Sequence, residues 1–197
     1  ERLGRGALAV KADVGSQAML NPAALNRKLL SVTGVAWNQF NNPYAGQALN
    51  YGNFDGGLNR MTRANEYTMV QTMIADRMMS ELSCNIVMTD FNKPVANRLL
   101  FGGVTLANTP ATADGDTAIQ ATAKNLHKVL WKEDVRGSDA EVQGTVGLCR
   151  AVLADRAVAP TRPTNCSYNN TNDPNYTGRS WAAVIAYMIG DSKFLFE

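Results

Sequence analysis

Aromatic, amide and acidic side chains crowd residues 37–60, a segment that has neither a helical nor a strand period. Aromatic rings and amides can stack on and hydrogen-bond a sugar or a peptide, and loops longer than about 12–15 residues tend to be functional or disordered. So many aromatic residues are not typical of disorder. The sequence therefore predicts an ordered loop that holds whatever site the protein has. The candidate ligand-binding residues are Trp37, Tyr44, Tyr51, Asn53 and Asp55. The same rings would also plug the loop against neighbouring helices, which is the interpretation we favour.

One turn of this loop is the best candidate for a metal site. Asn53 and Asp55, with the backbone carbonyls of residues 51–52, offer the oxygen ligands that calcium prefers. A calcium site usually contains several carboxylates, whereas this turn has one. The pattern Asn-x-Asp-Gly-Gly is also typical of an ordinary turn, and we favour that interpretation. We expect no covalently bound cofactor, because no C-x-x-C-H motif for haem attachment occurs.

His127 is the sole histidine of the chain, so any relay that needs an imidazole base would have to use it. No G-x-S-x-G motif accompanies it. A lone histidine among apolar neighbours on a predicted helix is typical of a structural residue, and we expect that role; haem held by His127 and a methionine is the competing hypothesis. Two acids that converge in a cleft, as glycoside hydrolysis requires, are not evident among Glu66, Glu81 and Asp90. These residues favour a protein that is not an enzyme, and an enzyme stays open as the second hypothesis.

The three cysteines allow competing disulfides. Cys166 lies in a polar segment rich in Pro and Asn, an exposed place where an oxidising compartment would favour a bridge. A Cys149–Cys166 disulfide would close a short loop and add roughly 3 kcal/mol of stability on the chain-entropy model. A Cys84–Cys166 pair is the alternative, and Cys84 otherwise fits a buried free thiol.

Charge and composition argue against nucleic-acid binding and against a membrane-spanning segment. Nineteen basic and seventeen acidic residues leave a net charge of +2, without a run of basic side chains, so we expect no nucleic-acid partner. No stretch approaches 18 consecutive apolar residues, so no membrane span is predicted. With 45% hydrophobic residues, the 197-residue chain can bury a core as one domain, and we expect residues 1–197 to form a single helical domain.

Helix signals dominate the chain outside residues 37–60. Asn21 as a cap, Pro22 at the first position and Gly34 as a stop predict a helix over 23–33. Further helices are predicted over 66–89, 94–100, 117–132, 139–156, 181–189 and 193–197. No alternating strand pattern exceeds four or five residues. The predicted fold is mainly α, an irregular bundle of about six to seven helices with one long ordered loop.

Several details of these helices are also predicted. Asn65 is the expected cap of the longest helix, and Ser138 with Glu141 forms a capping box for the helix over 139–156. Gly144 and Gly147 suggest either close approach of a second helix or a weak helix. The last predicted helix stops with its apolar face unfinished, which suggests part of a larger protein or assembly.

Residues 49–55, 78–84, 125–133, 173–187 and 194–197, read together, resemble one protein family. These segments are similar to uncharacterised exported bacterial proteins, mainly helical, that occur fused to or encoded beside c-type cytochrome domains. The resemblance implies export to the periplasm or the extracellular space and a redox-associated context. In that family the covalent haem belongs to a separate C-x-x-C-H module, so the resemblance supplies no active-site residues.

Two hypotheses on function follow. The first is a non-catalytic exported helical module, a structural or partner-binding subunit of a larger electron-transfer assembly, with protein subunits that include a c-type cytochrome as partners. The second is a secreted enzyme or binding module that acts on a polysaccharide or other polymer through residues 37–60, with Asp55 as one of its acids.

Overall fold

The computed structural model describes residues 19–41, 68–108, 113–137, 139–155, 173 and 176–196. Its α-helices there are α2 (Pro22–Thr33), α4 (Met69–Phe91), α5 (Ala113–Leu126), α6 (Ala140–Asp155), α7 (Thr177–Gly190) and α8 (Ser192–Leu195). A π-helical turn, η3 (His127–Trp131), continues α5, and the 3-10 turns are η1 (Asn38–Phe40) and η2 (Val95–Asn97). Within these residues the β-structure is one isolated bridge between Met19 and Phe196. The prediction of a mainly α fold is confirmed.

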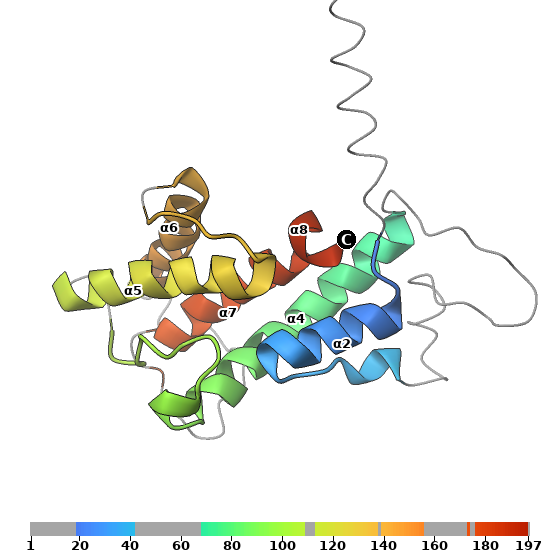
Figure 1. Ribbon diagram of the computed structural model, residues 1–197, viewed down its shortest axis with the longest axis horizontal. Helices are drawn as coiled ribbons and strands as arrows, with labels where there is room; N and C mark the ends of the chain where they lie inside the picture. The colour runs from blue at the N-terminus through green and yellow to red at the C-terminus, as the bar shows by residue number, and fades with distance from the viewer. Residues whose placement is uncertain are drawn as a thin grey trace, which may run out of the picture.

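Helix α7 is the centre of the packing. It contacts α4 on one side and α6 on another, and α6 in turn contacts α5. Figure 1 shows α5, α6 and α7 gathered in one part of the molecule, and α2 with the long α4 in the other. Apolar residues occupy most positions of α7, and Trp181, Val184 and Ile185 are fully buried. A helix that is apolar on nearly all sides is expected in the middle of a core rather than at its surface.

Helix α2 forms as its local sequence predicts. The Asn21 side chain accepts a hydrogen bond of 2.8 Å from the amide of Ala24, and Pro22 occupies the first turn, where its missing N–H costs nothing. Gly34 ends the helix with a φ of 76°, a left-handed conformation that glycine adopts without steric strain.

Helix α4 begins later than predicted. Thr68 is its N-cap and forms a capping box with Gln71, so the predicted cap at Asn65, which lies outside the described residues, is wrong. The helix then runs to Phe91, and Met78, Ile86 and Val87 are fully buried as its apolar pattern predicts.

The predicted helix over 94–100 does not form. Only the single turn η2 is helical, and the carboxylate of Asp90 at the end of α4 accepts hydrogen bonds from the amides of Leu99, Leu100 and Phe101 at 2.8–2.9 Å. A buried carboxylate thus replaces the helical carbonyls as the acceptor for this segment.

Several other details differ from the prediction. Helix α5 starts at Ala113, so Asp114 and Asp116 lie in its first turn, and it gives way to η3 at His127. Ser138, half of the predicted capping box, lies outside the described residues. Phe194 and Leu195 are fully buried, so the apolar face of α8 is not unfinished.

The glycines of α6 do not mark a close helix contact. A Cβ atom added at Gly144 or at Gly147 would meet nothing within 4 Å, which leaves the weak-helix interpretation. The close approach occurs instead at Gly190, the last residue of α7, where a Cβ would overlap the side chain of Met79 in α4. None of the described helices combines the length and the apolar character needed to cross a lipid bilayer.

Candidate functional site

Trp37, at the start of the predicted loop, is a core residue. It is buried, packs edge-on against Phe40 with ring centroids 4.7 Å apart, and donates a hydrogen bond of 2.8 Å from Nε1 to Glu81 of α4. A ring placed in this way cannot stack on a ligand. Tyr44, Tyr51, Asn53 and Asp55 lie outside the described residues, so an ordinary turn or a calcium site, and packed rings or a ligand site, stay the predicted alternatives there.

His127 opens the π-helical turn η3, and its side chain is fully buried. Its Nε2 lies 2.9 Å from the hydroxyl oxygen of Thr145 in α6, and its Nδ1 lies 3.4 Å from Oε2 of Glu133. The ring also packs edge-on against Trp131, one helical turn later, with centroids 4.7 Å apart. Both ring nitrogens therefore have a polar neighbour inside the protein, and the imidazole is held firmly in one orientation.

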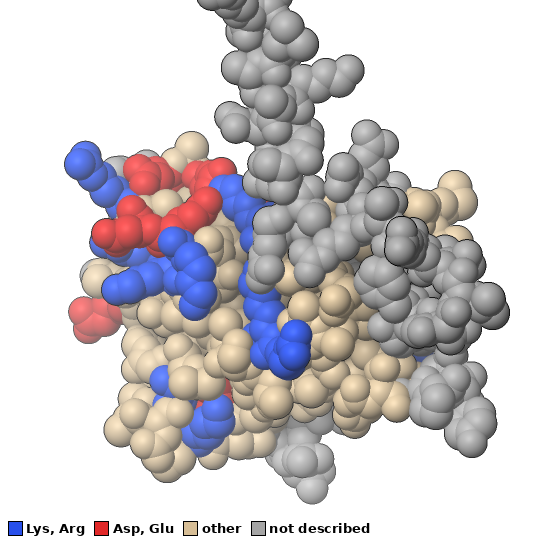
Figure 2. All heavy atoms as spheres, turned by 45° about the vertical axis from the view of Figure 1, so that its right-hand side comes forward, with Lys and Arg blue, Asp and Glu red and all other residues tan. Residues whose placement is uncertain are grey.

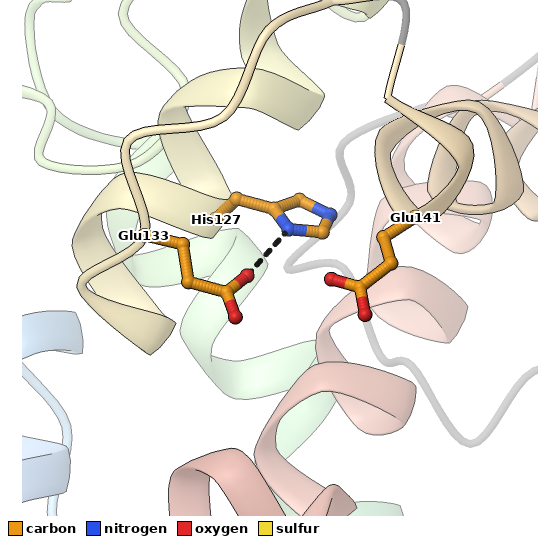
Figure 3. Close-up of side chains that lie close together, drawn as sticks. All are labelled: His127, Glu133 and Glu141. Carbon is orange, nitrogen blue, oxygen red and sulfur yellow. Dashed lines mark hydrogen bonds and ion pairs between the residues drawn. The ribbon is translucent and has the colours of Figure 1, made fainter.

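Two carboxylates approach this imidazole from different elements. Glu133 belongs to the segment after η3 and Glu141 to the first turn of α6. In Figure 3 both carboxylates lie on the same side of the ring and point toward one another. One ligand atom from each of His127, Glu133 and Glu141 can be chosen so that all three lie within 4.8 Å of one another. We call these three residues the His–Glu–Glu cluster.

Lys193 of α8 supplies the positive charge beside this cluster. Its Nζ lies 2.7 Å from Oε1 of Glu133 and 2.6 Å from Oε2 of Glu141, so one ammonium group bridges both carboxylates. The same Nζ sits 4.8 Å from the centroid of the Trp131 ring, within the range of a cation–π interaction. The indole is itself fixed by a hydrogen bond of 2.9 Å from its Nε1 to the carbonyl of Met188.

These contacts shift the ionisation of the groups around His127. Partial burial acts to raise the pKa of Glu133, but hydrogen bonds from Lys193 and His127 outweigh it and hold that pKa below its ordinary value. Burial acts to lower the pKa of Lys193, yet the two carboxylates keep it above its ordinary value. Burial, with the negative charges of Asp191 and Glu141, raises the pKa of Tyr187, whose ring packs against Trp131.

The arrangement binds positive charge rather than moving protons. A general acid needs a carboxyl pKa near the working pH, whereas Glu133 is shifted the other way. The imidazole is fully buried and engaged on both sides, as expected for a structural histidine. Carboxylates and an imidazole that converge are, however, the ligand types that divalent metals use.

Sequence reasoning singled out His127 and missed its partners. Glu133, Glu141 and Lys193 come from three separate elements, and only the packing of α6 and α8 against η3 brings them together. Glu141 had a local explanation as part of a capping box. No local pattern distinguishes Lys193 from any other surface lysine.

Cys149 is a free thiol in the core of α6, and its Sγ lies 3.4 Å from Oγ of Ser180. Burial raises its pKa to about 11, which the hydrogen bond to Ser180 and the nearby Arg150 only partly offset. The predicted Cys149–Cys166 disulfide is therefore wrong for Cys149. Cys166 lies outside the described residues.

A second feature lies on the exposed surface of α4. Three apolar side chains near its start remain in solvent, with exposed fractions of 81% for Met69, 49% for Val70 and 65% for Met73. We call these three residues the apolar strip. Figure 2 shows charged side chains concentrated in parts of one face, while uncharged residues cover much of its remaining described surface. Exposed apolar residues that are neighbours on a helix often mark a protein contact.

Comparison of the chain with protein-family models, with curated proteins and with solved structures found no match.

Proposed function

We propose that this chain is a non-catalytic helical module, exported from the cell, that serves as a structural or partner-binding subunit of a larger assembly. The observation that carries the proposal is the apolar strip, in which Met69 and Met73 expose more than half of their side chains on a well-formed helix. Leaving such side chains in water is unfavourable, and a partner that covers them would gain roughly 25 cal/mol for each Å² removed from solvent. Methionine is also adaptable in shape, which suits a protein contact.

The state of His127 supports the non-catalytic part of the proposal. It is the chain's one histidine, it is fully buried, and both ring nitrogens face protein side chains. A relay of hydroxyl, imidazole and carboxylate would use these same contacts, but Thr145 and His127 are both buried, which keeps them from a substrate in solution. The competing polymer-binding hypothesis used Trp37 as part of its binding platform, and the burial of that ring speaks against such a use.

Export and a cytochrome partner enter the proposal through the family resemblance of the sequence. The expected partners are protein subunits, with a c-type cytochrome among them, and the haem would belong to that partner. A calcium site at Asn53 and Asp55 stays the alternative to the ordinary turn that the sequence favours there.

The test compares two charged substitutions at exposed apolar positions. The full chain, affinity-tagged in its native host, is purified gently, and co-purifying proteins and haem absorbance are measured. Met73→Glu places a charge in the apolar strip and should abolish co-purification. Val95→Glu, at a position that is 53% exposed in η2, is the matched control and should retain it.

Circular dichroism should show native helix content in both variants. Equal recovery of partners with Met73→Glu and with Val95→Glu would remove the strip as the contact surface. A chain that elutes alone as a monodisperse monomer from its host would contradict the subunit role itself.

A further inference from the structure

The proposed function rests on the apolar strip and does not use the His–Glu–Glu cluster. We propose that His127, Glu133 and Glu141 bind a divalent transition-metal ion of the zinc class, which replaces the ammonium group of Lys193. The metal would have a structural role, because it would tie η3, the segment that follows it and α6 together. The inference goes beyond the proposed function and does not depend on it.

The orientation of the imidazole is the first argument. The hydroxyl of Thr145 lies 3.1 Å from the backbone carbonyl of Glu141 and donates a hydrogen bond to it. When that hydrogen is used there, Thr145 can accept a hydrogen bond from Nε2–H of His127 at 2.9 Å, and Nδ1, which faces the carboxylates, is the nitrogen left to bind an ion. A metal-binding histidine typically shows this arrangement, with one nitrogen donating to an oxygen and the other free for the ion.

The contact between His127 and Glu133 is the second argument. Nδ1 lies 3.4 Å from Oε2 of Glu133, which is long for a hydrogen bond between an imidazole N–H and a carboxylate. A metal ion bound to both atoms would replace the proton between them with two coordination bonds.

Charge balance is the third argument. Glu133 and Glu141 together carry two negative charges, and the Lys193 ammonium compensates one of them. A divalent cation in its place would neutralise both carboxylates. Partly buried charges interact strongly because the protein screens them less than water does, so the full compensation is favourable.

The geometry needs only small movements of exposed groups. Ligand atoms around a tetrahedral zinc ion, at bond lengths of about 2.0–2.2 Å, lie about 3.4 Å apart. The Nδ1 to Oε2 distance of 3.4 Å already fits, and the cluster as a whole spans at most 4.8 Å. Glu141 has a side chain that is 53% exposed and can close the gap, while Lys193, at 35%, can turn outward. Water would supply the fourth ligand.

The experiment is calorimetric titration of the full chain, without a polyhistidine tag, with Zn²⁺. One ion should bind per chain. Lys193→Met should bind it more tightly, because the competing ammonium is gone, and Glu141→Gln should bind it about tenfold more weakly or worse. Lys128→Met and Asp134→Asn, at exposed positions close to the cluster in sequence, are the matched controls and should bind as the native chain does.

Two further readouts separate this site from accidental binding. Co²⁺ bound in place of Zn²⁺ should give visible absorption without a thiolate charge-transfer band, because no cysteine is a ligand. The fluorescence of Trp131 should change on binding, since Lys193 leaves its ring. His127→Gln should abolish binding, and circular dichroism checks that this variant folds.

Three results would overturn the proposal. One is equal zinc affinity of the native chain, Lys193→Met and Glu141→Gln. Another is the absence of binding in both the native chain and Lys193→Met. Binding by Lys193→Met alone would also overturn it, because the lysine would then be the resident cation and no metal would displace it.

Discussion

The indole Nε1 of Trp37 donates a hydrogen bond of 2.8 Å to the carboxylate of Glu81, which joins the segment after α2 to the middle of α4. The backbone amide of Trp37 is held as well, by a hydrogen bond of 2.6 Å to the side chain of Asn26. Because Arg77 also pairs with Glu81 at 2.6 Å, the carboxylate serves two partners and its charge is compensated. Trp37 thus anchors the chain where it enters the predicted loop.

Trp37→Phe tests whether this anchor matters. The change keeps an aromatic ring and removes the hydrogen bond, and we expect a loss of about 1–2 kcal/mol in the free energy of unfolding, measured by urea denaturation. Glu81→Gln keeps an acceptor oxygen for the indole and should cost less. Unchanged stability of Trp37→Phe would show that the hydrogen bond from the indole to Glu81 contributes nothing to stability.

Asp90→Asn should be one of the most destabilising single-atom changes in the chain. The carboxylate is fully buried and accepts from the amides of Leu99, Leu100 and Phe101. An asparagine keeps one acceptor oxygen and turns an NH₂ group toward the remaining amides. We expect a loss of about 2 kcal/mol by chemical denaturation. Asp134→Asn, at an exposed position, should change stability little, and a similarly small effect for Asp90→Asn would contradict the role of Asp90.

The same carboxylate explains why part of the fold could not be predicted from the sequence. The signals of α2 are local, since its cap, its proline and its terminal glycine all lie within or beside the helix, and its bounds were predicted to within a residue. The segment 94–100 has comparable local signals for a helix. Its amides are satisfied by Asp90 instead, and no helical period encodes a hydrogen bond from a residue outside the segment.

The candidate site, too, could be predicted from the sequence only where the signal is local. The structural role expected for His127 rests on its solitary position among apolar residues, and burial agrees with it. The carboxylates beside it come from the segment after the π-helical turn η3, which follows Leu126, and from α6. A π turn has no clear sequence signature, so the meeting of His127, Glu133 and Glu141 could be found only in three dimensions.

Asp116 gives a predicted pH dependence of stability. The Arg150 guanidinium of α6, with Gln120, hydrogen-bonds its carboxylate and holds its pKa below the ordinary value of 3.8. A carboxyl whose pKa is lowered by folding contributes stability above its unfolded pKa, and this contribution is lost as the pH falls through the folded pKa. Asp116→Asn should therefore reduce the fall in melting temperature on acidification to about pH 3.

Asp114→Asn, an exposed neighbour in the same turn, should leave the fall in melting temperature unchanged. Identical pH profiles for Asp116→Asn and the native chain would show that the ion pair contributes nothing.

Gly190→Ala tests the close contact between α7 and α4. An added Cβ would overlap the sulfur of Met79, and since this is the far end of a flexible, half-buried side chain, its shift should cost about 1 kcal/mol, the lower end of the range for overpacking. Met79→Ala in the same chain should restore part of the loss, because it removes the overlapping atoms. Gly144→Ala is the matched control: a Cβ there meets nothing, and alanine favours a helix over glycine by about 0.5–1 kcal/mol. Denaturation midpoints should therefore move in opposite directions for the two glycine variants, and a shift in the same direction would contradict the contact.

Thiol chemistry gives the last prediction. Cys149 is free and buried, and burial raises its pKa to about 11, so it should react with a thiol reagent only after the chain unfolds. Since Cys149 is unpaired, we predict that any disulfide in the oxidised protein joins Cys84 to Cys166, the alternative pairing that the sequence allows. Non-reducing proteolysis with mass spectrometry should yield that cross-linked pair, and titration in denaturant should count one thiol per chain.

The control variant Cys149→Ser should abolish that single thiol and leave the cross-linked peptide in place. A peptide that joins Cys149 to Cys166, or rapid labelling of Cys149 in the folded protein, would contradict the burial of this thiol against Ser180.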